Sequence, residues 1–208
     1  IVAENELVSL FELWHAKSGG ILVLEPKTGK VLAMSALPEF DPNEYFKEEN
    51  LSVFLNPFVE KIFEVGSVFK AITMAIAKDS GSITPETTYV DRGFVEVGGA
   101  RLKNFDEKPR GKRNMTQVLE ESLNTGVVFA MQQTGKKTFK EYLESFGFYE
   151  KTNIDLPGEV KSNLSNLNSG REVEFATASF GQGIALSPIA ISRALAVLAN
   201  GGRLVEPY

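Results

Sequence analysis

The sequence predicts an α+β fold, with a small amount of sheet near the beginning of the chain and a larger helical part after it. Two short apolar runs, Ile21–Leu24 and Val31–Met34, flank the turn sequence Pro-Lys-Thr-Gly and predict a β-hairpin. The stretch Ser67–Ala77 is apolar on nearly all sides, which predicts a helix in the middle of a core. With 208 residues, 43% of them hydrophobic and 24% charged, the chain is large enough to fold around a core of its own.

The remaining elements follow from apolar periodicity, capping residues and turn residues. Apolar residues at helical spacing predict a helix over 6–15, and the stretch 37–57, with three prolines, is predicted to be a loop. The elements expected after the buried helix are a hairpin over 94–105 with its turn at Gly98-Gly99, a basic loop at 108–112, a helix capped by Thr116 that ends at Ser122, two helices that end at Thr134 and Phe146, a polar loop over 156–171, and a helix over 188–199 capped by Ser187. The length allows one domain or at most two small ones.

The composition excludes several kinds of site. With no Cys and a single histidine, His15, the chain can form no disulfide, no thiolate metal site and no site that needs two imidazoles. We therefore expect no metal and no cofactor. The net charge of -5 argues against a nucleic-acid partner. No apolar run approaches the roughly 20 residues that span a bilayer, so we expect no transmembrane segment in this chain.

Ser67 and Lys70 form the only Ser-x-x-Lys string in the chain. Residues three apart on a helix lie on one face, about 5–6 Å apart at Cβ, so the Lys70 amine can reach the Ser67 hydroxyl. A serine hydroxyl is a weak nucleophile until a base takes its proton, and burial in an apolar helix turns a lysine into such a base by lowering its pKa. The alternative is a helix-capping serine with a lysine that extends to solvent.

Ser122 and Asn124 lie where one predicted helix gives way to the next. A hydroxyl beside a lysine can pass a proton to a leaving group, and the amide of Asn124 can bind a lysine and a peptide bond together because it both donates and accepts. The alternative is local capping. Glu120-Glu121 either pairs with a basic neighbour or faces water. The basic stretch Arg101–Arg113 is expected to be a solvated loop, with contact to acidic groups of peptidoglycan as the alternative.

Five short segments occur in a recognisable order. They are Ile21–Met34, Phe40-Asp41-Pro42-Asn43, the run Phe-Glu-Val-Gly-Ser-Val-Phe-Lys over 63–70, Ser122-Leu123-Asn124 and Phe180-Gly181-Gln182-Gly183. This set resembles the transpeptidase domain of penicillin-binding proteins, most closely the monofunctional class B branch, from about residue 16 to the end of the chain. The resemblance implies the fold shared by penicillin-binding transpeptidases and serine β-lactamases. Val65 and Val68 depart from the family's usual Pro and small residue, and we expect only local repacking from them.

The resemblance implies a peptidoglycan D,D-transpeptidase of the serine-type D-Ala-D-Ala transpeptidase/carboxypeptidase class. Carried over to the matching positions, Ser67 would be the nucleophile and Lys70 its base, Ser122 would relay a proton, and Asn124 would hold the lysine and the substrate amide. The implied partners are peptidoglycan stem peptides and β-lactam antibiotics, with contacts to other cell-wall synthesis proteins left open. The implied location is the extracytoplasmic face of the bacterial cytoplasmic membrane, to which the parent protein would be anchored.

The family's third motif, Lys-Thr-Gly, is not found where it is expected. The only literal copy, Lys27-Thr28-Gly29, precedes Ser67 and lies in the predicted hairpin turn, whereas the family's motif follows the Ser-x-Asn box on a strand that lines the cleft. We therefore expect residues 1–208 to be a partial transpeptidase domain, truncated before the late sheet strands and inactive alone. The membrane anchor, the N-terminal non-catalytic domain and the C-terminal part with the third motif would lie outside it.

Two alternative functions stay open. A β-lactamase or a β-lactam sensor would share the fold and the first two motifs. A non-catalytic binding module would keep a buried Lys70 for structural reasons only.

Overall fold

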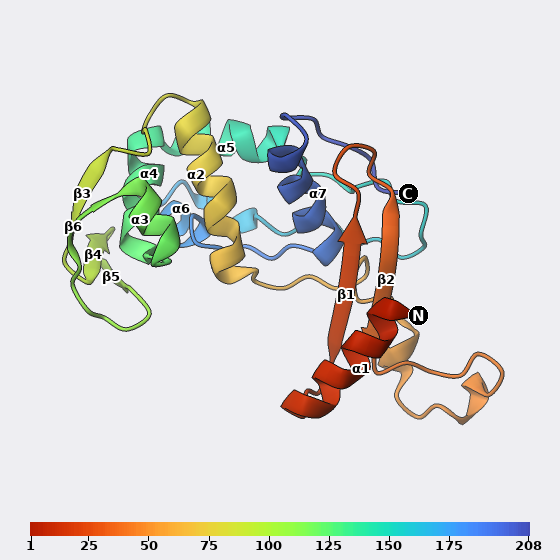
Figure 1. Cartoon of the computed structure of the whole chain (residues 1–208). Coiled ribbons are helices and arrows are strands. Elements are labelled where there is room, and N and C mark those ends of the chain that lie inside the picture. Colours follow the sequence, from red (N-terminus) through yellow and green to blue (C-terminus); the bar gives the residue numbers. More distant parts are fainter. The chain divides into compact units, whose positions relative to one another are not determined.

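A computed structural model describes residues 1–208, and the chain forms two compact units, each made of segments that are far apart in the sequence. The first unit consists of Ile1–Ile62, Glu150–Lys161 and Ser187–Tyr208. The second consists of Phe63–Tyr149 and Ser162–Leu186. Both helices and strands are present, as the predicted α+β class requires (Figure 1).

The first unit is built on the hairpin of β1 (Gly19–Leu24) and β2 (Val31–Leu37), which confirms the predicted hairpin. The strands pair antiparallel, from Gly19 opposite Leu37 to Leu24 opposite Val31. Helix α1 (Val2–Trp14) packs against both strands, and α7 (Pro188–Ala199) packs against β1. The core of this unit consists of Phe58, Val59, Ile154 and Ile189, against which Leu22, Val31, Met34 and Ala36 pack.

The turn of this hairpin contains the sequence Lys27-Thr28-Gly29. The Glu25 N–H donates to the Lys30 carbonyl at 2.8 Å, and the Gly29 N–H donates to the Glu25 carbonyl at 2.9 Å. These bonds close a tight turn, so this copy of Lys-Thr-Gly forms part of the hairpin turn, as predicted. Two 3₁₀ helices, η1 (Tyr45–Lys47) and η2 (Leu51–Phe54), are the only regular structure in the long loop after β2.

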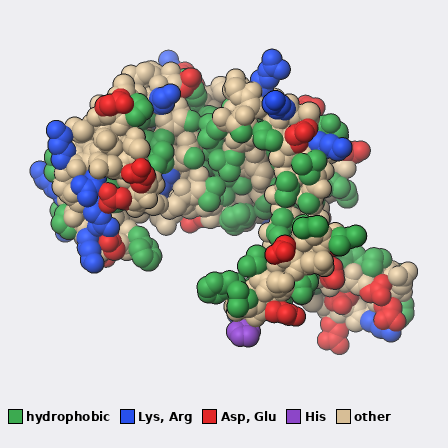
Figure 2. Space-filling view, in the orientation of Figure 1, with side chains coloured by type: hydrophobic (Ala, Val, Ile, Leu, Met, Phe, Trp, Pro, Cys, Tyr) green, Lys and Arg blue, Asp and Glu red, His purple; other side chains and the backbone are tan.

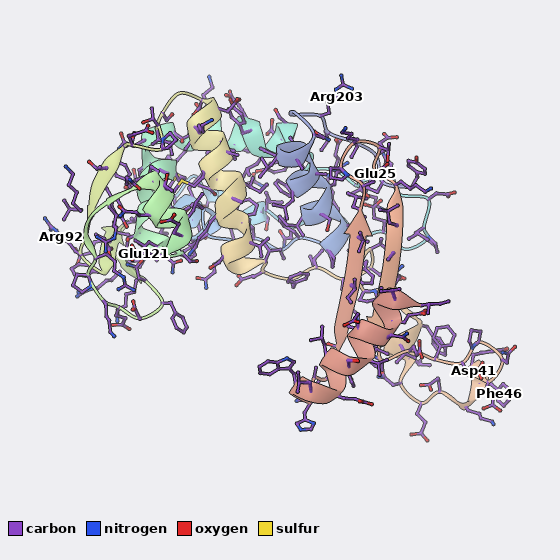
Figure 3. The ribbon with its side chains drawn as sticks, in the orientation of Figure 1. Glu25, Asp41, Phe46, Arg92, Glu121 and Arg203 are labelled. Atoms are coloured by element: carbon purple, nitrogen blue, oxygen red, sulfur yellow. The ribbon has the colours of Figure 1, made fainter.

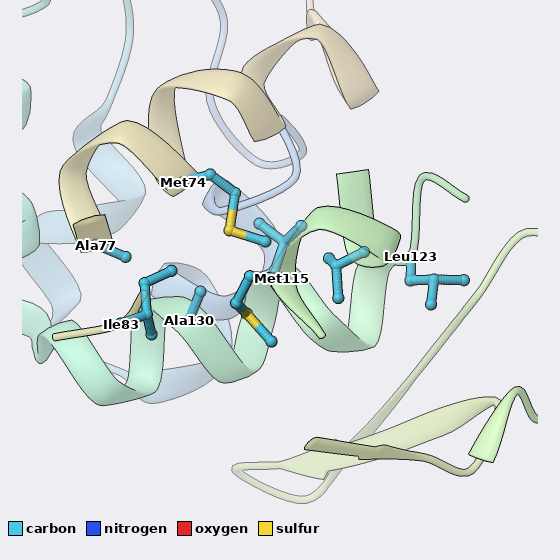
Figure 4. Close-up of a cluster of buried hydrophobic side chains, with 8 residues drawn as sticks. Met74, Ala77, Ile83, Met115, Leu123 and Ala130 are labelled. Carbon is cyan, nitrogen blue, oxygen red and sulfur yellow. The ribbon is translucent and has the colours of Figure 1, made fainter. Parts of the chain in front are cut away.

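The second unit is centred on α2 (Lys70–Asp79), which continues from the 3₁₀ helix η3 (Gly66–Phe69). Helix α4 (Asn124–Thr134) and helix α5 (Lys136–Ser145) pack against α2, and α3 (Met115–Glu120) packs against α4. Their shared core is a cluster made of Met74, Ala77, Ile83, Met115, Val118, Leu123, Val127 and Ala130 (Figure 4). The predicted buried helix is therefore confirmed, apart from the exposed side chains of Ser67 and Val68 at its start.

Four short strands form two antiparallel pairs in the same unit. β3 (Thr88–Asp91) pairs with β6 (Gly111–Asn114), and β4 (Phe94–Val97) pairs with β5 (Ala100–Lys103). The predicted turn at Gly98-Gly99 is confirmed, because both residues have positive φ angles of 56° and 83°, as a type I′ turn requires. We call residues 88–114, which contain all four strands, the β-arm.

The unit is completed by η4 (Ser165–Ser169) and α6 (Glu172–Ala178). The chain after α6 returns to the start of the unit through an antiparallel bridge between Phe63 and Leu186. It thereby brings residues 180–183 beside η3, where the Gly66 N–H donates to the Gly181 carbonyl at 3.1 Å.

Several details of the sequence prediction are wrong. The first helix starts at Val2, not at residue 6, and the predicted loop over 156–171 contains η4. Asn114, not Thr116, caps α3: its side chain accepts from the Gln117 N–H at 2.9 Å, and the Gln117 side chain accepts from the Asn114 N–H at 3.0 Å. This reciprocal pair is a capping box, and the helix starts directly after it, at Met115. The helix ends at Glu120, before Ser122. The loop predicted at 108–112 gives way to β6 at Gly111, because backbone pairing with β3 forms a strand that its polar side chains do not reveal.

The surface differs in character from place to place. Figure 2 shows Lys and Arg side chains gathered over the β-arm, and Arg92 extends outward from the end of β3 in Figure 3. The guanidinium of Arg101 lies 3.5 Å from the centre of the Phe94 ring, a cation–π contact.

His15 ends α1 in the left-handed conformation, with φ of 47°. None of the helices combines the length and the apolar character needed to cross a membrane.

We predict that Gly126→Ala destabilises the second unit. A Cβ at Gly126 would collide with both methyl groups of Val118 and lie 2.9 Å from the Tyr89 hydroxyl, so α3 and α4 would have to separate. Overpacking of this kind costs about 1–3 kcal/mol and outweighs the roughly 1 kcal/mol by which Ala favours a helix. Urea unfolding should show a lower midpoint for Gly126→Ala. It should also show that Gly126→Ala/Val118→Ala loses less stability than the sum of the two single changes; additive losses would contradict the collision.

Candidate functional site

One cavity of about 500 Å³ in the second unit contains all four residues singled out in the sequence. Ser67, Lys70, Ser122 and Asn124 all line it. The remaining lining residues are Gly66, Asn104, Phe105, Asp106, Arg110, Glu121, Leu123, Phe180 and Gln182. Residues from η3, α2, the β-arm, the α3–α4 turn and the segment after α6 therefore meet at one place.

Ser67 lies in η3, the 3₁₀ turn that leads into α2, and its side chain is exposed to the cavity. The segment after α6 holds this turn at two points: the Gly66 N–H donates to the Gly181 carbonyl, and the Gly183 N–H donates to Glu64 Oε1 at 2.7 Å. Gly181 has a φ of 77°, and a Cβ at this position would collide with the Gly66 carbonyl. Only glycine allows the two backbones to lie this close, which explains why the Phe-Gly-Gln-Gly segment belongs to the site.

Lys70 is the first residue of α2 and is almost completely buried, with 3% of its surface exposed. Its Nζ donates to the Ser122 carbonyl at 2.5 Å and to the Ser122 hydroxyl at 2.9 Å. Burial lowers the pKa of Lys70 from 10.5 to about 8, because the charged form loses its hydration. The predicted burial of this amine is confirmed, and a larger fraction of it is neutral near neutral pH than for an ordinary lysine.

Ser122 lies in the turn between α3 and α4, with a positive φ of 53°. This left-handed conformation is uncommon for a residue with a Cβ and costs roughly 1–2 kcal/mol. Its N–H donates to the Leu119 carbonyl at 3.2 Å, and the next residue, Leu123, is 1% exposed and belongs to the core. The turn presents both the carbonyl and the hydroxyl of Ser122 to Lys70.

Asn124 begins α4, and its amide forms no hydrogen bond with Lys70. Its Nδ2 donates instead to the Lys103 carbonyl of the β-arm, at 2.8 Å. The amine of Lys70 is bonded to Ser122 rather than to Ser67. The structure thus brings the four predicted residues to one cavity, but the direct contact that it forms among them is the one between Lys70 and Ser122.

A charged rim and an exposed ring also border the cavity, and sequence reasoning did not identify them as part of the site. Arg110 Nη2 lies 2.7 Å from Asp106 Oδ2, and Glu121 accepts from Nε of both Arg110, at 3.1 Å, and Arg113, at 2.6 Å. Hydrogen bonds from Arg110 lower the pKa of Asp106. The pairing of Glu121 with a basic neighbour was one of two alternatives read from the sequence, and it is the correct one. The Phe105 ring is fully exposed.

The chain is similar to proteins of one known family. A family model described as penicillin binding protein transpeptidase domain matches residues 19–208. Stage V sporulation protein D of Bacillus subtilis (strain 168) is 35% identical over 208 residues, which are 100% of this chain and 32% of that protein. A peptidoglycan D,D-transpeptidase FtsI homolog of Chlorokybus atmophyticus is 33% identical over 220 residues, again 100% of this chain and 32% of the relative.

Solved structures agree with these matches. Penicillin binding protein 3 from Mycobacterium tuberculosis, in complex with aztreonam, superposes with a TM-score of 0.91 at 26% identity and covers 99% of this chain and 46% of that one. Its complex with ampicillin gives the same values. The chain therefore spans about a third of the length of the curated relatives and less than half of this solved one.

We predict a pH-dependent stability difference between the unmutated protein and Lys70→Met, which keeps an unbranched side chain but removes the amine. Because the pKa of Lys70 is about 8 in the folded chain and 10.5 when unperturbed, the unfolded state binds more protons between these pH values. The free energy of unfolding of the unmutated protein should therefore rise relative to that of Lys70→Met across this window, by on the order of 1 kcal/mol per pH unit. Urea unfolding of both proteins at several pH values measures the difference in their free energies of unfolding. Titration of the other groups contributes equally to both proteins and cancels. A constant difference would contradict the lowered pKa.

Proposed function

Because the chain belongs to the penicillin-binding protein transpeptidase domain family, we propose that it forms the acylation site of a peptidoglycan D,D-transpeptidase. The observation that carries this proposal is the buried Lys70 amine, which donates to Ser122 in the cavity that Ser67 also lines. This set contains the groups that serine acyl transfer needs: a nucleophile, a base, and a second hydroxyl that can pass a proton on.

In the first half of the proposed reaction, Ser67 Oγ attacks the carbonyl carbon between two D-alanine residues of a stem peptide. Lys70 accepts the hydroxyl proton while the C–O bond forms and the carbonyl oxygen becomes an oxyanion. The backbone N–H of Ser67 donates to this oxyanion, a type of contact worth about 10²–10³ in rate. The C–N bond then breaks, and the proton passes from Lys70 through the Ser122 hydroxyl to the departing amine. Lys70 is neutral again at the end.

In the second half, the amine of a neighbouring stem peptide attacks the Ser67 ester. The new C–N bond forms, the C–O bond breaks, and the amine's proton returns to Ser67 Oγ by way of Lys70. Water in place of the amine would give the carboxypeptidase reaction. We assign Asn124 to the substrate amide: because its Nδ2 is held by the Lys103 carbonyl, its Oδ1 is the atom that accepts from the substrate N–H.

We extend the proposal to ligands and location. The solved relatives named with aztreonam and ampicillin support β-lactams as ligands of this site. A β-lactam would acylate Ser67 by the same attack, but its amine stays tethered to the adduct, so no leaving group departs. Relatives in peptidoglycan synthesis support stem peptides as the natural substrate, and with it a location on the extracytoplasmic face of a membrane.

We predict that Ser67→Ala abolishes labelling of the full-length protein by a fluorescent penicillin. The change removes the only atom that forms the ester, and because the Ser67 side chain is exposed, the folded structure should be unaffected. Gel fluorescence measures the adduct, and circular dichroism checks folding. Asp79→Asn, an exposed substitution on α2 outside the cavity, should label normally. Unchanged labelling of Ser67→Ala would refute Ser67 as the nucleophile.

The lifetime of the adduct in the same experiment separates the proposed enzyme from its alternatives. A β-lactamase of this fold would clear the penicilloyl ester rapidly, whereas a transpeptidase would hold it for many minutes. A sensor would also hold the adduct but would not join stem peptides. A non-catalytic module would not become labelled.

We predict that the acylation rate of the full-length protein rises with pH and levels off above about pH 8, where Lys70 is neutral. At pH 7 only about a tenth of a group with such a pKa is unprotonated, so the rate should increase roughly tenfold between pH 6 and pH 7. Stopped-flow or quenched labelling at fixed penicillin concentration measures it, with reagent hydrolysis subtracted. A pH-independent rate would show that Lys70 is not the base.

A further inference from the structure

Asp91, at the end of β3, is a buried carboxylate that the proposed reaction does not use. Asp91 is 2% exposed. None of the groups that donate hydrogen bonds to its carboxylate is a cationic side chain. It accepts from the Gly93 N–H at 3.0 Å, from the Arg110 N–H at 2.8 Å, from the Asn104 amide at 3.0 and 3.1 Å, and from the Thr125 hydroxyl at 2.7 Å. Burying a charge without a cationic partner is costly, so a hydrogen-bond set of this completeness needs a reason.

The network around Asp91 reaches the residues on the far side of Ser122. Thr125 follows Asn124 in the first turn of α4, and its N–H donates to Asn104 Oδ1 at 3.2 Å. The Tyr89 hydroxyl lies 3.1 Å from the Thr125 hydroxyl. Asp91 and Asn104 together therefore attach the start of α4 to the β-arm.

The same carboxylate also fixes the near side of Ser122. It accepts from the backbone of Arg110, whose side chain binds Glu121, the residue directly before Ser122. Ser122 is thus bracketed by Glu121 and Thr125, and Asp91 is connected to both, directly to Thr125 and through Arg110 to Glu121.

Ser122 needs such bracketing because its left-handed backbone is unfavourable. Residues in this conformation persist only where their surroundings hold them. If the turn relaxed to an ordinary negative φ, the Ser122 carbonyl would rotate, and the Lys70 amine would lose its closest hydrogen bond, the one of 2.5 Å.

We propose that Asp91 is a positioning residue for acylation: it ties the β-arm to both sides of Ser122 and so keeps the Ser122 carbonyl and hydroxyl against the Lys70 amine. This inference rests on the proposed function, because acylation of Ser67 is the step that it supports. Asp91 touches neither Ser67 nor Lys70 and acts only through the turn.

The test is Asp91→Asn in the full-length protein, labelled with a fluorescent penicillin. The amide keeps the shape of the carboxylate but turns an NH₂ group toward neighbours that are themselves donors. The acylation rate at saturating penicillin should fall at least tenfold, while the dissociation constant of the initial complex changes less than threefold. The midpoint of the pH–rate profile should move upward, because a Lys70 amine released from Ser122 reaches water and regains part of its ordinary basicity.

Two further variants keep the test decisive. Thr125→Val removes one donor to Asp91 at constant size and should show the same pattern with a three- to tenfold loss, even if Asp91→Asn proves too unstable to purify. Asp79→Asn, which removes an exposed carboxylate bonded to the Tyr142 hydroxyl, should change neither rate nor midpoint. If Asp91→Asn and Thr125→Val both have the acylation rate and pH midpoint of the unmutated protein, the inference about Asp91 is overturned while the proposed function stands. An unmutated protein that cannot be labelled at all would overturn the proposed function and the inference with it.

Discussion

The contact between the Lys70 amine and the oxygens of Ser122 is the interaction on which the rest of the site depends. It joins the first turn of α2 to a turn 52 residues further along the chain. Burial drives the amine toward its neutral form, yet a buried N–H still needs an acceptor. A carbonyl and a hydroxyl supply that acceptor without a full negative charge. A carboxylate in the same place would favour the ammonium form and cancel the effect of burial. The neutral partner therefore allows Lys70 to be buried and, in the proposed reaction, to act as a base.

This contact requires two different kinds of support. The first kind is apolar: the buried Leu123, directly after Ser122, anchors the turn in the apolar core that α2, α3 and α4 share. The second kind is polar: the β-arm, whose Tyr89 also packs against that core, forms hydrogen bonds to the residues around Ser122 through Lys103, Asn104 and Arg110. Apolar packing is non-directional and fixes where the turn lies, whereas hydrogen bonds are directional and fix how its peptide groups are rotated. A left-handed residue depends on the second kind of support more than on the first.

The parts of the site that are visible in the sequence are those that depend on local spacing. Ser67 and Lys70 are one helical turn apart, so their meeting at one face follows from helix geometry and the apolar run around them. The sequence around Ser122 and Asn124 is by itself only a weak indication of a site. The resemblance to the family is what assigned these two residues to it. The role of Asp91 could not be predicted, because its partners lie up to 34 residues away and are brought together by pairing of β3 with β6. That pairing was itself hidden, since β6 consists of Gly, Lys, Arg and Asn, which carry no strand pattern.

The two reacting sides of the cavity are therefore held by separate structures. The turn that carries Ser67 is clamped by the segment after α6, through Gly181, Gly183 and the bond from Thr73 Oγ1 to the Ser179 carbonyl at 2.7 Å. The turn that carries Ser122 is clamped by the β-arm. Lys70, at the head of α2, is bonded to Ser122 on one side and is covalently continuous with the turn of Ser67 on the other. In the proposed reaction, displacement of the first clamp would move the nucleophile relative to its base, and displacement of the second would remove the acceptor that keeps the base in place. The groups for attack and for proton relay in the proposed reaction are thus held by separate structures, although both steps would use Lys70.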